Sequence, residues 1–314
     1  IIDGVFNHCG SFNKWMDKEH IYRDSTDEYE PGAYEKYESP YHNFFKFFSN
    51  NFESLGLKKL ITTGYKADGK GVKLVYEGDK NGNFMVDDAE VVMTELEGNG
   101  DFRSEECIEL LKECDVVVTN PPFSLFREYV AQLMEYGKKF LIIGNQNAIT
   151  YKEVFRYIKE DKIRLGYKSM SSNAWYVVPN GNKYEKIVDG EKCCLMRNTC
   201  WFTNLKVDVA SKCAMAKLMY DFSKPDTLES YYELSEDERN EKYPKYDNYY
   251  AINIEKSKDI PGDYFVVIGV PISFLYYLDP TVWDVIGCSY EYGDCGKHIS
   301  GTPWGCEIKG NPIY

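Results

Sequence analysis

The sequence lacks the features that would assign it to several classes of protein. It contains no run of about 18 consecutive apolar residues, so a membrane-spanning helix is not expected. Its ten cysteines include no Cys-x-x-Cys pair, and its four histidines are too scattered to predict a zinc site. Scattered reduced thiols are typical of an intracellular protein. We therefore expect no bound metal, no disulfide framework and a cytoplasmic location.

Positive charge is scarce in the chain as a whole. The formal net charge is −13, whereas strong nucleic-acid binders usually carry a basic surface. One short stretch is locally basic, because five cations outnumber Glu160 and Asp161: Arg156, Lys159, Lys162, Arg164 and Lys168. These cations either contact nucleic-acid phosphates or form the solvated face of an amphipathic helix and an edge strand. The sequence leaves both interpretations open.

The most informative stretch is Asn120-Pro121-Pro122-Phe123. It directly follows residues 115–119, a β-branched run that predicts a buried parallel strand. Residues 125–135 place apolar side chains at helical spacing, and residues 139–144 predict the next buried strand. Together they predict a right-handed βαβ unit of an open α/β sheet. Ligands bind such sheets at the carboxyl ends of the strands, which is where the tetrapeptide is expected.

The tetrapeptide suits methyl transfer to an amino group that is conjugated with an aromatic ring. Such a nitrogen is a poor nucleophile, because its lone pair is delocalised into the ring. The side-chain oxygen of Asn120 and the carbonyl of Pro121 can accept its two hydrogens, which favours a localised lone pair. Pro121 and Pro122 hold these acceptors rigid, and Phe123 offers a face for stacking an extruded base. The alternative is an ordinary proline turn that ends a strand.

Seven separate sequence blocks extend the pattern beyond the tetrapeptide. They are Phe44-Phe45-Lys46-Phe47-Phe48 and residues 51–63, 100–104, 119–129, 197–205, 269–275 and 287–293. Through these blocks, the chain from about residue 43 to residue 314 resembles the EcoRI-type adenine-specific DNA methyltransferases. Several blocks in one order are far more specific than a motif of four residues.

The resemblance implies a Rossmann-like α/β fold with S-adenosylmethionine as methyl donor and adenine in double-stranded DNA as target. It also implies a restriction-modification or phage context, in which a cognate restriction endonuclease is a partner. Methylation of RNA or of a protein amide is an alternative, but those enzymes usually end the motif in Tyr, so Phe123 favours DNA adenine. The catalytic residues would be Asn120, Pro121, Pro122 and Phe123.

The resemblance also indicates where the cofactor binds. Asp101 and Phe102 match the family's position after the third strand, where a carboxylate takes the adenine amino group of the cofactor. The alternative is an ordinary loop in which Asp101 helps to cap a helix over residues 104–114.

The first residues resemble a different family. Ile1-Ile2-Asp3-Gly4-Val5-Phe6-Asn7-His8, with its continuation to about residue 44, is similar to the first conserved region of the α-amylase-type glycoside hydrolases. The later blocks that carry the catalytic carboxylate pair of that family are absent, so we expect no hydrolase chemistry. The chain therefore resembles a chimera or fragment, with an inactive chimera and a carbohydrate-active fragment as alternatives. Because residues 1–42 offer no glycine-rich loop of the methyltransferase type, we expect weak cofactor binding.

These patterns predict three parts of the chain. Residues 1–43 form an amylase-like fragment, residues 44–205 a catalytic domain, and residues 206–314 a target-recognition region with an acidic surface insertion at 221–250. Within the catalytic part, we expect a helix over residues 44–55 and strands over residues 59–63, 174–178 and 193–203. A hairpin is expected to pair residues 72–77 with residues 84–86.

Overall fold

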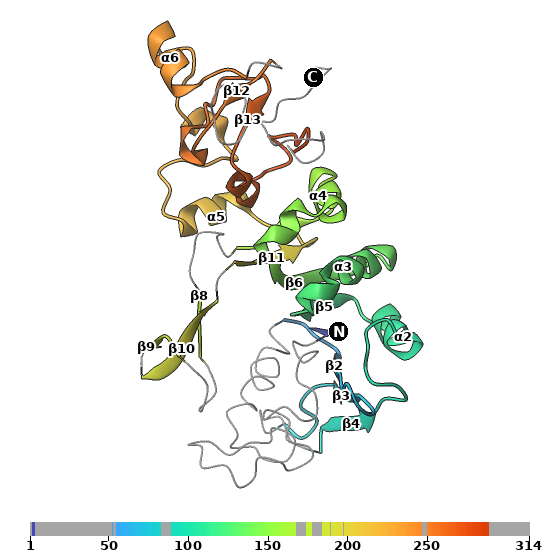
Figure 1. Cartoon of the computed structure of the whole chain (residues 1–314). Helices are drawn as coiled ribbons and strands as arrows, with labels where there is room; N and C mark the ends of the chain where they lie inside the picture. The colour runs from blue at the N-terminus through green and yellow to red at the C-terminus, as the bar shows by residue number, and fades with distance from the viewer. Residues whose placement is uncertain are drawn as a thin grey trace. The chain divides into compact units, whose positions relative to one another are not determined.

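A computed structural model describes residues 2–3, 52, 55–82, 89–167, 174–177, 184–188, 190–196, 198–246 and 250–288 (Figure 1). The chain divides into two compact units. Unit 1 comprises residues 1–146 and 171–205, and unit 2 comprises residues 147–170 and 206–314. The expected boundary after residue 205 is thus also a boundary between the units, but residues 147–170, expected in the catalytic domain, belong to unit 2. The expected helix over residues 44–55 lies almost entirely outside the described residues.

The main sheet of unit 1 runs in the order β1, β5, β6, β11. Strand β5 (Val116–Thr119) and strand β6 (Lys139–Asn145) are parallel, and helix α3 (Phe126–Glu135) connects them. This confirms the strand–helix–strand order predicted around the tetrapeptide. Strand β1 (Ile2–Asp3) pairs in parallel with β5 on its other side, so the first residues of the chain contribute a strand to this sheet.

The buried residues explain why this unit forms. Val117, Phe140 and Ile142 of the two parallel strands are completely buried, as expected for a sheet covered on both faces. Helix α3 packs through its apolar stripe, in which Phe126 and Val130 are buried. The apolar spacing that predicted the helix is therefore the face that packs into the core.

A second sheet of unit 1 is antiparallel, with strand β3 (Val72–Tyr76) between strand β2 (Leu60–Gly64) and strand β4 (Val91–Glu95). The prediction that residues 84–86 pair with β3 is wrong, because β2 and β4 occupy both of its edges; residues 84–86 themselves lie outside the described residues. In the connection between β3 and β4, the buried carboxylate of Glu90 accepts a hydrogen bond from the backbone N–H of Lys80 at 2.6 Å. Helix α2 (Glu105–Glu113) follows β4 in the chain.

The third sheet corrects another prediction. Strand β10 (Glu191–Met196) pairs with β8 (Ala174–Val177) and β9 (Lys186–Val188), whereas β11 (Thr199–Thr203) pairs with β6 in the main sheet. The single strand expected over residues 193–203 is therefore two strands in different sheets. The break lies at Asn198, whose φ of 55° is left-handed and cannot continue a strand.

Unit 2 consists of short elements joined by longer connections. Its helices and strands are α4 (Lys152–Lys159), β7 (Arg164–Leu165), α5 (Val209–Met215), α6 (Glu236–Lys242), β12 (Ile252–Asn253) and β13 (Ile268–Gly269). Among the described residues, 3₁₀ turns lie at Pro225–Thr227, Ser257–Asp259 and Ile272–Tyr276 of unit 2, at Gln146–Thr150 where the two units meet in the sequence, and at Phe123–Leu125 before α3 in unit 1. No helix in the described ranges is long and apolar enough to cross a membrane.

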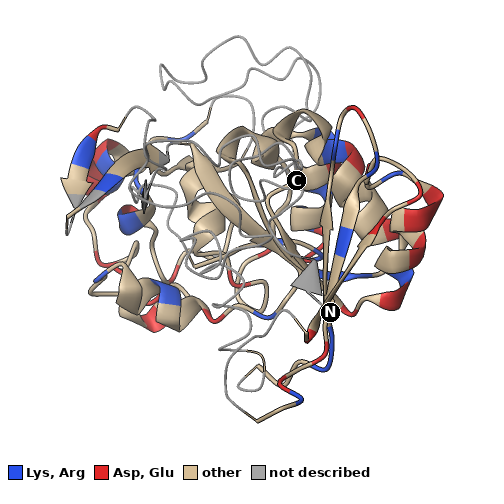
Figure 2. Ribbon diagram, turned by 90° about the horizontal axis from the view of Figure 1, so that it is seen from below, with Lys and Arg blue, Asp and Glu red and all other residues tan. Residues whose placement is uncertain are grey.

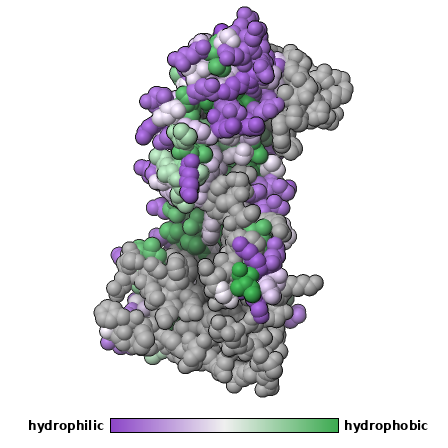
Figure 3. All heavy atoms as spheres, turned by 90° about the vertical axis from the view of Figure 1, so that its left-hand side faces the viewer, coloured by the Kyte–Doolittle hydropathy of each residue, from purple (hydrophilic) through white to green (hydrophobic). Residues whose placement is uncertain are grey.

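The acidic stretch at residues 221–250 is not the surface insertion that its composition predicted. Phe222 is completely buried, and Tyr231 and Tyr243 lie with it in the core of unit 2 beside Ile252 and Ile260. Tyrosine rings bury large apolar areas, so the rings of this stretch enter the core together with the aliphatic residues around them. The face of unit 2 in Figure 3 is mostly hydrophilic.

Candidate functional site

The tetrapeptide lies at the carboxyl end of β5, as the sequence predicts. Asn120 follows the last strand residue directly, and its Oδ1 atom is buried with no hydrogen-bond partner in the described part of the chain. Pro121 is buried, while Phe123 leaves 41% of its surface exposed. The loop therefore presents an unused amide oxygen and an exposed ring within four residues of one another.

The loop is held in place by the 3₁₀ turn η2 (Phe123–Leu125), which leads into α3. The backbone N–H of Leu125 donates to the Pro122 carbonyl at 3.0 Å, and the N–H of Phe126 donates to the Phe123 carbonyl. A buried acceptor without a partner costs about 1–3 kcal/mol. An oxygen kept in that state by a rigid loop fits a site that receives a hydrogen-bond donor from a ligand.

Sequence reasoning missed the glycine that seats α3 beside this loop. A Cβ atom on Gly144, in strand β6, would lie 2.5 Å from the Phe126 ring and 2.7 Å from the Phe202 ring. Only glycine lets the start of α3 approach the sheet this closely. The signal was present in the sequence as a glycine near the end of a predicted buried strand.

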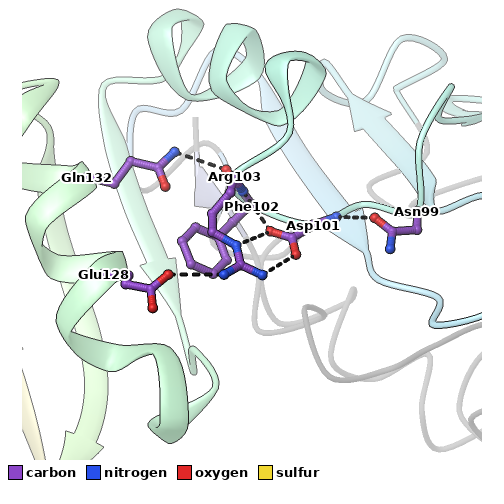
Figure 4. A network of polar contacts seen from close by, with 6 residues as sticks. All are labelled: Asn99, Asp101, Phe102, Arg103, Glu128 and Gln132. Carbon is purple, nitrogen blue, oxygen red and sulfur yellow. Dashed lines mark hydrogen bonds and ion pairs between the residues drawn. The ribbon is translucent and has the colours of Figure 1, made fainter.

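The second predicted site lies in the loop between β4 and α2 (Figure 4). Arg103 donates to the Asp101 carboxylate three times: from its backbone N–H to Oδ1 at 2.9 Å, from Nε to Oδ1 at 3.0 Å and from Nη2 to Oδ2 at 2.8 Å. These hydrogen bonds hold the pKa of the Asp101 carboxyl below its ordinary value. The N-cap of α2 is Ser104, whose Oγ accepts from the Cys107 N–H, so Asp101 does not have the capping role considered as its alternative.

Phe102, also predicted at the cofactor site, packs against α3. Its ring meets the ring of Tyr129 edge to face, with centroids 4.9 Å apart, and its carbonyl accepts from Gln132 Nε2 at 3.0 Å. Both rings line a cavity of about 40 Å³ between β2, α2 and α3.

Two further glycines shape the backbone that leads to Asp101. Gly100 has a φ of 81°, and a Cβ atom on it would lie 2.6 Å from the Gly64 carbonyl oxygen. A Cβ atom on Gly71 would lie 2.7 Å from the same oxygen. The loop after β2 and the loop before Asp101 are thus in backbone contact, which Lys66 N–H secures by donating to the Asn99 carbonyl at 2.9 Å. The sequence showed Gly100 only as part of a family block.

The predicted DNA contacts are largely paired within their own segment of unit 2. Arg164 donates to the Asp161 carboxylate from Nε at 2.6 Å and from Nη2 at 2.7 Å, while Lys162 and Arg156 lie 2.7 and 3.9 Å from Glu160. Lys159 lies in the last turn of α4, and Lys168 is outside the described residues. Figure 2 shows basic and acidic residues next to one another on the helices. Exposed pairs of this kind contribute about 0–1 kcal/mol, so they can exchange partners readily.

Comparison with known proteins identifies the family. Residues 36–302 match the family model described as adenine-specific methyltransferase EcoRI. The type II methyltransferase M.EcoRI of Escherichia coli is 44% identical over 258 residues, which cover 78% of this chain and 74% of that protein. The type II methyltransferases M.MpnI of Mycoplasma pneumoniae and M.MgeORF184P of Mycoplasma genitalium are 36% and 35% identical, each over 78% of this chain and 71% of the relative. No solved structure matches the chain.

The family match agrees with the order of the sequence blocks and leaves residues 1–35 outside it. It confirms the expected activity class, and the expected α/β fold agrees with the parallel strands and the helix around the tetrapeptide. The chain therefore belongs to the EcoRI-type adenine-specific DNA methyltransferases, which use S-adenosylmethionine as methyl donor.

Proposed function

We propose that this chain methylates the exocyclic amino group of an adenine that has been turned out of double-stranded DNA into a site at the end of β5. The observation that carries the proposal is the buried Oδ1 atom of Asn120, which lacks a partner among the described residues, next to the exposed ring of Phe123. An acceptor oxygen and a stacking face are the two features that an extruded adenine requires.

In this proposal, Asn120 and Pro121 prepare the nucleophile. The Asn120 amide oxygen and the Pro121 carbonyl accept the two hydrogens of the adenine amino group. The nitrogen then becomes pyramidal, and its lone pair points at the methyl carbon. The rigid turn after Pro122 aligns both acceptors before the substrate arrives, so little reorganisation is needed during the reaction. Phe123 stacks on the base and holds its plane.

S-adenosylmethionine supplies the electrophilic methyl group, and the Asp101 loop fits its adenine end. An ionised carboxylate has about four lone-pair positions. Arg103 uses two on Oδ1 and one on Oδ2, so one position on Oδ2 remains for a further donor. The adenine amino group of the cofactor is a donor that this position accepts. We propose that Asp101 and Phe102 hold this end within a Rossmann-like arrangement of the main sheet.

We further propose that residues 206–314 form the target-recognition region and that the cations of residues 156–168 contact DNA phosphates. Phosphate contacts position the duplex without reading its sequence. The paired state of Arg156, Lys162 and Arg164 agrees with contacts that form only when DNA replaces their carboxylate partners. A restriction endonuclease that cuts the same sequence is the expected partner enzyme.

The proposed acceptor is tested by supplying tritiated S-adenosylmethionine with duplex DNA, RNA or protein in separate reactions. We expect label only in duplex DNA, and nucleoside digestion should yield N6-methyladenosine in its deoxy form. Label in RNA or protein, or a methylated cytosine, would show that the acceptor has been assigned wrongly.

A further inference from the structure

The Asp101 loop is attached to the same helix that carries the tetrapeptide. Arg103 Nη1 donates to Glu128 Oε2 at 3.1 Å, and the Phe102 carbonyl accepts from Gln132 (Figure 4). The Phe102 ring also meets the ring of Tyr129. Gln132 lies four residues after Glu128 and three residues after Tyr129 in α3, so it neighbours both of them on the helix surface. This side of α3 therefore fixes the position of the loop.

Arg103 is the residue that fixes the carboxylate itself. Its Nε and Nη2 atoms meet one oxygen each, in the forked geometry that determines both the plane and the direction of a carboxylate. Its third nitrogen, Nη1, holds Glu128 of α3. Because Arg103 satisfies three of the four acceptor positions on Asp101, the direction of the remaining one is set by Arg103 and not by Asp101 alone.

We propose that Arg103 is a positioning residue that aims the open acceptor position of Asp101 at the adenine amino group of the cofactor, and that it thereby sets the preference for an adenosyl over an inosyl cofactor. The inference rests on the proposed function of Asp101. The inosyl compound carries a 6-oxo group and an N1–H where the adenosyl compound carries a 6-amino group. A carboxylate that is free to rotate can turn away from the 6-oxo group or accept from the N1–H, so the preference for the adenosyl compound becomes smaller. A carboxylate fixed by Arg103 meets the 6-oxo oxygen with a lone pair, which disfavours binding of that analogue.

The test compares the dissociation constants of S-adenosylhomocysteine and S-inosylhomocysteine, measured by ligand-observed NMR so that weak binding is still measurable. In the wild-type chain we expect at least about a tenfold preference for the adenosyl compound, the size of one hydrogen bond to a charged group. Arg103→Gln and Arg103→Lys should both reduce the preference to within about threefold, since lysine keeps the charge but lacks the fork. Glu128→Gln should give an intermediate ratio.

Two features keep the outcomes distinct. Lys112→Gln is the matched control, because it removes a cation from a surface pair with Glu109 on α2 and should leave the ratio unchanged. The Arg103 side chain is about half exposed, so its substitution should preserve the fold, which circular dichroism checks. If the Arg103 variants keep the full wild-type ratio, Asp101 remains in place and only this inference is overturned. If the wild-type chain binds both compounds without a preference, the assignment of Asp101 fails and the inference fails with it.

Discussion

Gly144 of β6 lies so close to Phe126 of α3 that a Cβ atom would sit 2.5 Å from the aromatic ring. Phe126 is the first residue of α3, and the helix follows the tetrapeptide loop directly. This contact therefore sets the position of the proposed catalytic loop relative to the sheet. Gly144 has a role in packing that no chemical motif would reveal.

Gly144→Ala should destabilise the chain by about 1–3 kcal/mol, because the new methyl group overpacks two buried rings. Chemical denaturation of the variant measures this loss. Gly98→Ala is the control, since a Cβ atom there meets nothing within 4 Å. An unchanged midpoint for Gly144→Ala would show that α3 can move away from β6 at no cost.

Asn120→Ala should reduce methyl transfer by about a hundredfold or more, because it removes an acceptor that acts most strongly in the transition state. Stability should be unchanged or higher, since the lost oxygen had no partner among the described residues.

Asn204→Ala is the control, because it should lower stability through lost hydrogen bonds. Asn204 accepts from the Phe140 N–H at 2.8 Å and donates to the Lys138 carbonyl at 2.7 Å, so its loss should lower stability. Near-normal turnover in Asn120→Ala would remove Asn120 from the reaction.

Phe123→Ala should weaken capture of the extruded base by about 1–3 kcal/mol, whereas Phe123→Trp should keep much of the stacking energy. Fluorescence of 2-aminopurine at the target position reports extrusion of the base. Val92→Ala, an exposed position on β4, serves as the control. Equal fluorescence enhancement in the wild type and in Phe123→Ala would contradict a stacking role.

Buried Tyr276 of unit 2 should make the protein sensitive to alkali. Burial raises the pKa of Tyr276 to about 12, above the ordinary value of 10.0. The neutral form is thus favoured in the folded state, so its contribution is complete below about pH 10 and is lost as the pH rises towards 12. Denaturation midpoints should fall over this window, and less steeply in Tyr276→Phe. Tyr250→Phe, at an exposed position, should keep the wild-type slope, and equal slopes in all three proteins would refute the linkage.

This chain should bind S-adenosylmethionine weakly. Strand β1 occupies the position beside β5, but the segment that follows it, which we expect to be amylase-like, contains no glycine-rich loop. Loss of two charge-assisted hydrogen bonds at the methionine end costs about 3–6 kcal/mol, which moves a micromolar site towards millimolar. Titration calorimetry on this chain, and on a variant with a family-type first segment, measures the difference. A low-micromolar dissociation constant for the unmodified chain would show that the first segment supplies these contacts.

The sequence by itself determined the features that depend on neighbouring residues. The β-branched run before Asn120, the prolines after it and the helical spacing that begins at Phe126 predicted the order of β5, loop, α3 and β6, because each pattern acts within a few residues. The order of the family blocks determined the activity class. The sequence also predicted a helix over residues 104–114, which agrees with α2 (Glu105–Glu113), although its N-cap is Ser104 and not Asp101.

Only the tertiary structure decided what depends on distant residues. The hydrogen bond from Arg103 to Glu128 joins residues 25 positions apart, and the contact of Gly144 with Phe126 joins strand β6 to helix α3. The break at Asn198 and the burial of Tyr243 were likewise settled by packing: a strand joins whichever sheet offers a free edge, and a tyrosine-rich segment enters the core when other rings surround it. These contacts join segments that are distant along the chain, so no pattern of neighbouring residues predicts them.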